Sequence, residues 1–176
     1  MCFYQSPRSA FDIATQVAAI THSHPTAYLS AGAYCALLAY IMQECSLESA
    51  VSMTQNLLSR FAASSEVSDA ISSATTLASV GYPSRTKVQS FGSGQVASDA
   101  LAIALYCTLC YPDDLNKAIA LASNHSGISD TTAALCGAFV GARLGKVDGL
   151  QSMYDQVEGI DIVSRLTLDL VSNFAH

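Results

Sequence analysis

The sequence predicts an all-α fold, a compact orthogonal bundle of about eight helices that forms one domain over residues 1–176. Apolar residues recur at helical spacing in one segment after another, and no segment shows sustained alternation of apolar and polar residues. The chain is 51% hydrophobic and only 12% charged, which indicates extensive burial and argues against disorder. At 176 residues it is long enough to bury a core of ordinary size.

The first helices follow from apolar spacing and from their start signals. Apolar residues at helical spacing run from Phe11 to Thr21. Pro25 pre-sets the first turn of a second helix that continues to Met42. Ser46 is the expected N-cap of a third, amphipathic helix over residues 47–61.

The middle of the chain predicts two helices separated by a long connection. A fourth helix over residues 67–78 is stopped by Gly81 and by Pro83 beyond it. Residues 83–93 are polar, and we expect them to form the connection. A fifth helix over residues 96–109 is almost wholly apolar, which predicts a central position.

Three more helices complete the predicted bundle. Asp113 or Asp114 caps a sixth helix that ends at Ser123, a seventh covers residues 131–144, and apolar spacing supports an eighth over residues 162–170. In the seventh, small residues recur every four positions, which predicts a ridge that a neighbouring helix approaches closely: Ala133, Gly137, Gly141 and Gly145.

Charge and composition exclude several functional classes. The net charge of −6 offers no basic surface for nucleic acid or anionic lipid. The N-terminus lacks the pattern of a signal peptide, and the longest apolar run, residues 27–42, is shorter than the roughly 20 residues of a membrane span. We therefore expect a cytoplasmic protein with no nucleic-acid or membrane partner.

Most of the six cysteines fall within apolar helical patterns, where a thiol behaves as a small hydrophobic group. This placement predicts reduced cysteines and a reducing compartment. Cys107 and Cys110 have the spacing of a redox motif, but they end a helix and lack the strand context that such a motif requires. Core packing is the simpler interpretation of this pair.

The most informative motif lies at residues 125–131, His-Ser-Gly-Ile-Ser-Asp-Thr, directly before the seventh helix. It resembles the C-terminal signature of the ADP-ribosylglycohydrolase family, which reads His-Ser-Gly-Asp-Ser-Asp-Thr. Residues 92–106 resemble the family's segment Gly-x-Gly-Trp-Val-x-Glu-Glu-Ala-Leu-Ala-Ile-Ala-Leu, and residues 11–39 resemble its middle segment, in which Thr-His ends a helix. The family's all-α fold agrees with the helical periodicity.

The resemblance implies a pair of magnesium ions and an ADP-ribose ligand. It assigns Asp130 and Thr131 to metal binding and His22, Gly127 and Ser129 to substrate binding. The chain departs from the family pattern at its polar positions, where Ile128 replaces the first aspartate of the signature, Gln95 the tryptophan, and Ser98 with Asp99 the Glu-Glu pair. The family's N-terminal acidic runs have no counterpart here, so the resemblance extends to the C-terminal half of the family and the chain is expected to be truncated relative to it.

Asp130 has two interpretations. As the residue before the seventh helix it would be an N-cap, with its carboxylate accepting hydrogen bonds from free backbone N–H groups. As a metal ligand it would join the Thr131 hydroxyl in offering the hard oxygens that magnesium prefers. A two-metal site would be short of negative charge here, and the N-cap interpretation is favoured. A zinc or nickel site formed by His22, His24 and His125 is a further hypothesis, although their spacing does not favour it.

These observations lead to two functional hypotheses. The first is a catalytically impaired relative, a pseudoenzyme without catalytic residues, that acts by binding an ADP-ribosylated target, a toxin or effector, or a family partner. The alternative is a magnesium-dependent hydrolase of ADP-ribosyl N- or O-glycosidic bonds whose site is completed by another chain. Because a shortened domain would expose apolar helix faces, we also expect a homodimer or a protein partner.

Overall fold

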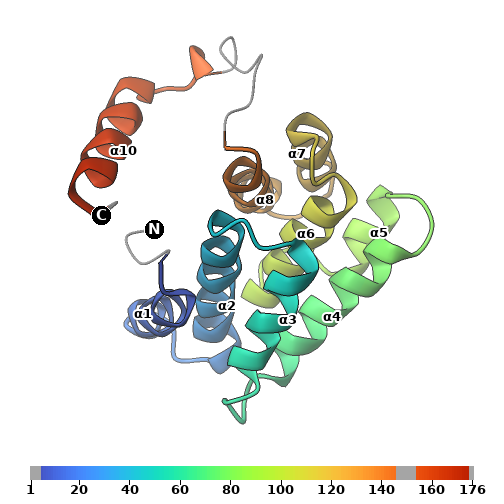
Figure 1. Ribbon diagram of the computed structural model, residues 1–176. Helices are drawn as coiled ribbons and strands as arrows, with labels where there is room; N and C mark the ends of the chain where they lie inside the picture. The colour runs from blue at the N-terminus through green and yellow to red at the C-terminus, as the bar shows by residue number, and fades with distance from the viewer. Residues whose placement is uncertain (1–4, 146–153, 175–176) are drawn as a thin grey trace. The chain divides into compact units, whose positions relative to one another are not determined.

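The computed structural model describes residues 5–145 and 154–174, and every regular element in these ranges is a helix (Figure 1). The predicted all-α class is thereby confirmed. Contacts between Cα atoms divide the chain into two units, a first that ends at Leu144 and a second that begins at Gly145.

The first unit contains all the described helices except α10. Their bounds are α1 (Pro7–Ala19), α2 (Pro25–Met42), α3 (Leu47–Leu58), α4 (Ser65–Ser79), α5 (Arg85–Ser90), α6 (Ala97–Cys110), α7 (Leu115–Ser123) and α8 (Ser129–Leu144).

Helix α6 is the centre of this unit. Every residue from Ala100 to Thr108 is buried, and the helix packs against α2, α4, α7 and α8 (Figure 1). The fully buried Tyr106 on α6 also holds the chain near α5, since its hydroxyl accepts a hydrogen bond from the Ser84 N–H at 3.3 Å. The predicted central position of this apolar helix is confirmed.

Helix α2 forms a second buried layer between α1, α3, α6 and α8. Its length and composition would allow it to cross a membrane, yet 56% of its residues are buried within the protein. Such burial is typical of the core helix of a globular bundle. Gly32 brings α1 close to α2, because an added Cβ would lie 3.0 Å from the Phe11 carbonyl oxygen.

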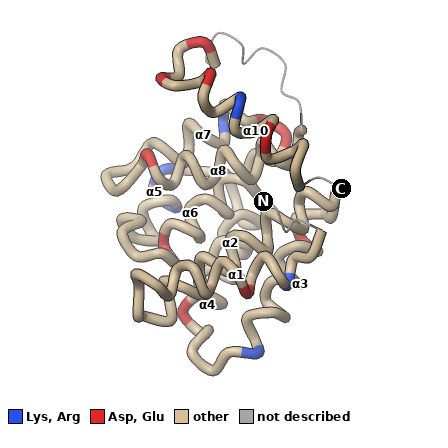
Figure 2. The backbone as a smooth tube through the Cα atoms, turned by 90° about the vertical axis from the view of Figure 1, so that its left-hand side faces the viewer, with Lys and Arg blue, Asp and Glu red and all other residues tan. Residues whose placement is uncertain are grey.

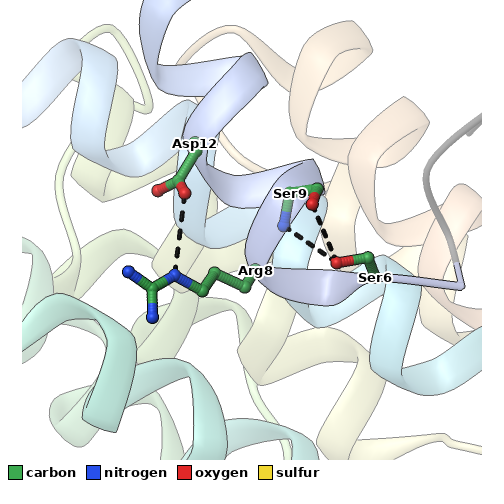
Figure 3. A network of polar contacts seen from close by, with 4 residues as sticks. All are labelled: Ser6, Arg8, Ser9 and Asp12. Atoms are coloured by element: carbon green, nitrogen blue, oxygen red, sulfur yellow. Dashed lines mark hydrogen bonds and ion pairs between the residues drawn. The ribbon is translucent and has the colours of Figure 1, made fainter.

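Side-chain caps fix several helix starts, and those at Ser46 and Asp114 were predicted. His24 caps α2 by accepting the Thr26 N–H at 3.3 Å, while Ser46 caps α3 and Asp114 caps α7. Ser6 caps α1, and Figure 3 shows its hydroxyl beside Ser9, whose N–H it accepts at 3.4 Å.

The same close-up shows the ion pair of Arg8 and Asp12, one turn apart on α1 with 3.8 Å between Nε and Oδ2 (Figure 3). Both side chains are largely exposed, so solvent screens the pair and it contributes little to stability.

Two predictions about local structure were wrong. The expected connection over residues 83–93 contains the short helix α5, which forms because the Ser84 hydroxyl accepts the Lys87 N–H at 3.3 Å and because Val88 is fully buried. The small-residue ridge of α8 does not receive a close neighbour along its length. A Cβ added at Gly137 would meet only the Ile119 side chain, at 3.4 Å, and one at Gly141 would meet nothing within 4 Å.

The cysteines behave as predicted for core packing. The five described cysteines are free thiols, and Cys107 and Cys136 are buried. Burial raises the pKa of the Cys107 thiol far above its usual range, which keeps it protonated and unreactive. This environment does not suit redox chemistry at the pair formed with Cys110.

The second unit contains helix α10 (Ile160–Phe174), which confirms the predicted last helix. Its apolar residues recur at helical spacing, and their side chains are exposed: Ile162, Val163, Leu166, Leu168, Leu170 and Val171.

Candidate functional site

The N-terminal ends of three helices line one pocket of about 570 Å³ in the first unit. Helix α2 contributes His24 and Thr26, α6 contributes Val96 and Ala97, and α8 contributes Thr131, with Ile128 directly before it. The remaining lining residues are Ala18, His22, Ala27, Ser30, Ala31, Tyr34, Cys35, Gly94, Gln95, Ala100, Leu101 and Leu135. We call this space the apolar pocket.

Backbone rather than side chains supplies the charge of the apolar pocket. No Asp, Glu, Lys or Arg is among its lining residues, in keeping with the sparse charges along the tube in Figure 2. A helix N-terminus carries a partial positive charge and unpaired N–H groups, and the start of α6 has no side-chain cap that would use them. The start of α6 is therefore the part of the pocket that best suits an anionic group, because the Thr26 N–H of α2 is taken by His24 and the Thr131 N–H of α8 by Asp130.

Ser30 and His22 are two of the polar side chains within this mainly apolar lining. Ser30 is 3% exposed, and its hydroxyl has no hydrogen-bond partner, which is costly for a buried polar group. The Nδ1 atom of His22 lies 2.8 Å from the Thr21 hydroxyl oxygen, which leaves Nε2 as the ring nitrogen for a ligand. Both residues can thus bond a polar group inside the pocket.

Tyr34 provides an aromatic wall. Its ring lies 4.7 Å, centroid to centroid, from the ring of Phe139, and its hydroxyl donates a weak bond of 3.5 Å to the Leu135 carbonyl. Burial, with smaller contributions from nearby Cys35 and Cys136, raises the pKa of Tyr34 to about 12. The phenol therefore stays neutral at physiological pH.

Two loops meet backbone to backbone at the rim of the pocket. The Ile128 N–H donates to the Ser93 carbonyl at 3.0 Å, and a Cβ added at Gly127 would lie 1.7 Å from that same oxygen. Gly94, with φ of +79°, lies against the Ile128 and Thr132 side chains, both 3.1 Å from its added Cβ. Glycine at these positions allows the loop before α6 to contact the loop before α8.

His125 is a structural residue. Its Nδ1 accepts the Gly127 N–H at 3.1 Å, so Nε2 carries the proton and donates to the Thr132 hydroxyl oxygen at 2.8 Å. The Thr132 hydroxyl donates in turn to the Ala122 carbonyl at 2.8 Å. With both nitrogens engaged and the ring buried, His125 does not join His22 and His24 in a metal site.

The predicted site residues are only partly brought together. His22 and Thr131 both line the apolar pocket, although they are far apart in sequence. Gly127, Ser129 and Asp130 lie next to the pocket in sequence but are not among its lining residues.

Asp130 is not the N-cap of its helix, contrary to prediction. Helix α8 begins one residue earlier, at Ser129, so Asp130 lies in the first turn, where its exposed carboxylate accepts the Thr131 N–H at 2.8 Å. The predicted start was one or two residues too late, which is the usual uncertainty of a helix boundary placed from sequence. Asp130 still complements the positive helix end.

The residues present do not fit a magnesium pair. Magnesium needs several oxygen ligands with negative charge, but the apolar pocket has no carboxylate in its lining and Ile128 presents carbon there. Within residues 5–145 and 154–174, no group of three or more His, Cys, Asp or Glu side chains is placed to hold a metal ion. Three positive helix ends would also repel a divalent cation.

Sequence reasoning missed Ser30, Gln95 and Tyr34 as pocket residues. The only signal available for Ser30 was a polar residue within the apolar run of α2.

Comparison with known protein families matches residues 1–175 to the family described as ADP-ribosylglycohydrolase. A search of curated proteins found no significant match.

Proposed function

The chain belongs to the ADP-ribosylglycohydrolase family, and from this premise we propose that it binds ADP-ribose, free or attached to a protein, without hydrolysing the glycosidic bond. The observation that carries the proposal is the apolar pocket, in which three helix N-termini converge and no charged side chain is present. Such a lining suits a phosphorylated ligand better than it suits a metal ion.

The two halves of the ligand find different partners in this arrangement. The diphosphate would accept hydrogen bonds from backbone N–H groups at the helix ends, above all at the uncapped start of α6. The ribose and base would lie against the apolar wall near Tyr34, with Ser30 and His22 bonding their polar atoms. Binding would also give the Ser30 hydroxyl the partner it lacks.

Absence of hydrolysis follows from the same lining. Metal-assisted hydrolysis requires a charged scaffold that holds the ions and activates water. Asp130 and Thr131 are the ligands that the family signature retains, and one exposed carboxylate cannot balance two magnesium ions. We therefore expect magnesium to bind weakly or not at all.

Calorimetric titration of the full chain with ADP-ribose tests the proposal. We expect binding with EDTA present, unchanged by magnesium, and about tenfold weaker in His22→Ala because a hydrogen bond to the ligand is lost. Gln89→Ala, a change at an exposed residue of α5 outside the pocket, is the matched control. Failure to bind either ADP-ribose or an ADP-ribosylated peptide at millimolar concentration would refute the proposal.

The alternative function is a magnesium-dependent hydrolase of ADP-ribosyl bonds whose missing ligands come from another chain. The exposed carboxylate of Asp130 favours it, since a second chain could reach that group. Release of ADP-ribose from arginine- or serine-linked substrates, measured with and without EDTA, decides between the two. We expect no turnover, and Ile128→Asp should not create any because it restores a single carboxylate.

We also propose that the chain associates with a second copy or a protein partner. The exposed apolar side chains of α10, among them Leu166 and Leu170, support this, because contiguous apolar surface commonly marks an interface. Sedimentation at micromolar concentration should show a species larger than the monomer. Leu166→Lys should shift it toward the monomer, whereas a monomeric wild-type chain would contradict the proposal.

A further inference from the structure

Most of the wall of the apolar pocket is hydrocarbon. Five of its lining residues are alanines, and larger aliphatic side chains come from Leu101 on α6, Leu135 on α8 and Ile128 before α8. Alanine side chains are short, and they leave a space of about 570 Å³ open between the helices. Water has few polar partners in such a space, so an apolar group is the favoured occupant.

One buried hydroxyl in this wall lacks a partner. Ser30 on α2 is 3% exposed and lines the pocket, and its Oγ has no hydrogen-bond partner among the described residues. Native proteins rarely leave a buried hydroxyl unsatisfied, because its lost hydrogen bonds to water are not replaced. A polar group on a ligand would supply the missing partner.

A second set of free donors lies at the start of α6. Val96 and Ala97 line the pocket there, and no side chain caps the helix, so its first backbone N–H groups have no acceptor. Asp99 lies in the same first turn, but its carboxylate neither caps the helix nor lines the pocket. Ser30 and the helix start therefore both offer donors to an acceptor group within the pocket.

The chemical class of the ligand follows from these donors and from the wall. The partial positive charge of a helix N-terminus favours an anionic head group over an ammonium group, and a carboxylate has two oxygens that accept hydrogen bonds. The aliphatic wall suits a hydrocarbon chain attached to that head group. We propose that the apolar pocket binds a monocarboxylate with an unbranched hydrocarbon chain, and that this ligand competes with ADP-ribose. The competition rests on the proposed function, whereas binding of the carboxylate does not.

Calorimetric titration of the full chain with hexanoate, octanoate and decanoate, each below its micellar concentration, tests the site. Each added pair of methylene groups should tighten binding about tenfold, because more apolar surface leaves water. Octanol should bind about tenfold more weakly than octanoate, since it lacks the negative charge, and octylamine should bind least because the helix end repels it.

Two variants test the wall. Ser30→Ala should weaken octanoate binding about fivefold and yet stabilise the unliganded protein, because it removes a buried hydroxyl without a partner. A serine with only a structural role would not give these opposite effects. Ser52→Ala, at an exposed serine of α3 outside the pocket, is the matched control and should change neither. Ile128→Asp should weaken octanoate binding more than tenfold, because it places a carboxylate beside the hydrocarbon chain.

Two cysteines report where the ligand lies. Cys35 lines the apolar pocket and Cys45 does not, although both are free thiols of intermediate exposure. Octanoate should slow the alkylation of Cys35 by N-ethylmaleimide severalfold and leave that of Cys45 unchanged, as mass spectrometry of the peptides would show.

Competition separates this inference from the proposed function. Octanoate should raise the apparent Kd of ADP-ribose. A chain that binds octanoate and protects Cys35 but does not bind ADP-ribose would refute the proposed function alone, whereas independent binding of both ligands would contradict a shared pocket.

Three further results would overturn the inference. They are affinity that does not rise from hexanoate to decanoate, binding of octylamine as tight as that of octanoate, and equal protection of Cys35 and Cys45. If Ser30→Ala did not fold, Ile128→Asp together with the cysteine labelling would decide.

Discussion

A second cavity of about 600 Å³ is lined by Glu66, Asp69 and Asp99, and we call it the acidic cleft. It shares the lining residue Val96 with the apolar pocket and yet differs from the pocket in electrostatic character. No charged side chain lines the pocket, and its polarity comes from backbone at helix starts, above all the uncapped start of α6, whereas the cleft carries negative charge from carboxylate side chains. Their polar walls also touch, because the Thr26 hydroxyl of the pocket donates to the Glu66 carboxylate of the cleft.

The difference shows that the two sites depend on different features of the chain. A site made from backbone depends on how closely loops approach each other, so glycine and buried hydrogen bonds control it. A site made from side-chain charge depends on protonation and ionic strength instead. The predictions below test this contrast, starting with the change expected to cost most.

Gly127→Ala should damage the pocket most. The new methyl group would lie 1.7 Å from the Ser93 carbonyl oxygen, so the loops must separate, at a cost of about 3 kcal/mol in the free energy of unfolding. Gly141→Ala is the matched control, since its Cβ meets nothing within 4 Å and should stabilise α8 by about 1 kcal/mol. Urea denaturation measures both. Equal stability of the two variants would contradict close contact at the rim.

Thr132→Val should cost about 2 kcal/mol, because it leaves the buried Nε2–H of His125 without its acceptor. Thr131→Val, at the exposed neighbouring position, should change stability by less than about 0.5 kcal/mol. Thermal unfolding of the pair is the measurement. A larger loss of stability in Thr131→Val than in Thr132→Val would show that the hydrogen bonds between His125 and Thr132 do not stabilise this region.

Asp130→Asn should cost about 0.5 kcal/mol, because the carboxylate no longer complements the positive end of α8. Millimolar magnesium should not change the melting temperature of wild type or of this variant, since a ligand stabilises only a fold that it binds. A magnesium-dependent rise of several degrees that disappears in Asp130→Asn would mean that the pocket region holds a metal after all.

The smallest effect concerns the pH response of the cleft. Burial raises the pKa of Asp99 above its unfolded value, so the folded state binds its proton more tightly. The resulting stability is fully present below the unfolded pKa of about 3.9 and is lost as the pH rises through the folded pKa. Asp99→Asn should therefore flatten the fall in the free energy of unfolding across that pH window. Urea denaturation of both proteins from pH 3 to 7 measures this free energy. The same dependence on pH in both proteins would contradict a perturbed Asp99 in the cleft.

Much of the fold could be predicted because local chemistry decided it. Pro25 after a capping histidine, Ser46 and Asp114 all mark helix starts through interactions within a few residues. Helix α5 escaped prediction because its six residues contain one buried position, Val88, too few to produce a period. The prediction for the ridge of α8 was wrong because glycines at every fourth position permit a neighbouring helix to approach closely but do not require it.

The sites were harder to predict because they depend on tertiary packing. Thr131 and His22 could be selected by family resemblance, but the convergence of three helix ends arises only when α2, α6 and α8 pack together. The acidic cleft gave no signal in the sequence. Glu66 and Asp99 become neighbours of one cavity only through the contact of α4 with α6.

The convergence of α2, α6 and α8 also bears on the order of folding. The residues that form the apolar pocket are drawn from positions as far apart as Ala18 and Leu135, so the pocket requires contacts between distant parts of the chain and should form late. Partial opening of any of the three helices would abolish it. Ligand occupancy would then slow hydrogen exchange throughout the first unit, including core amides of α6 that no ligand touches.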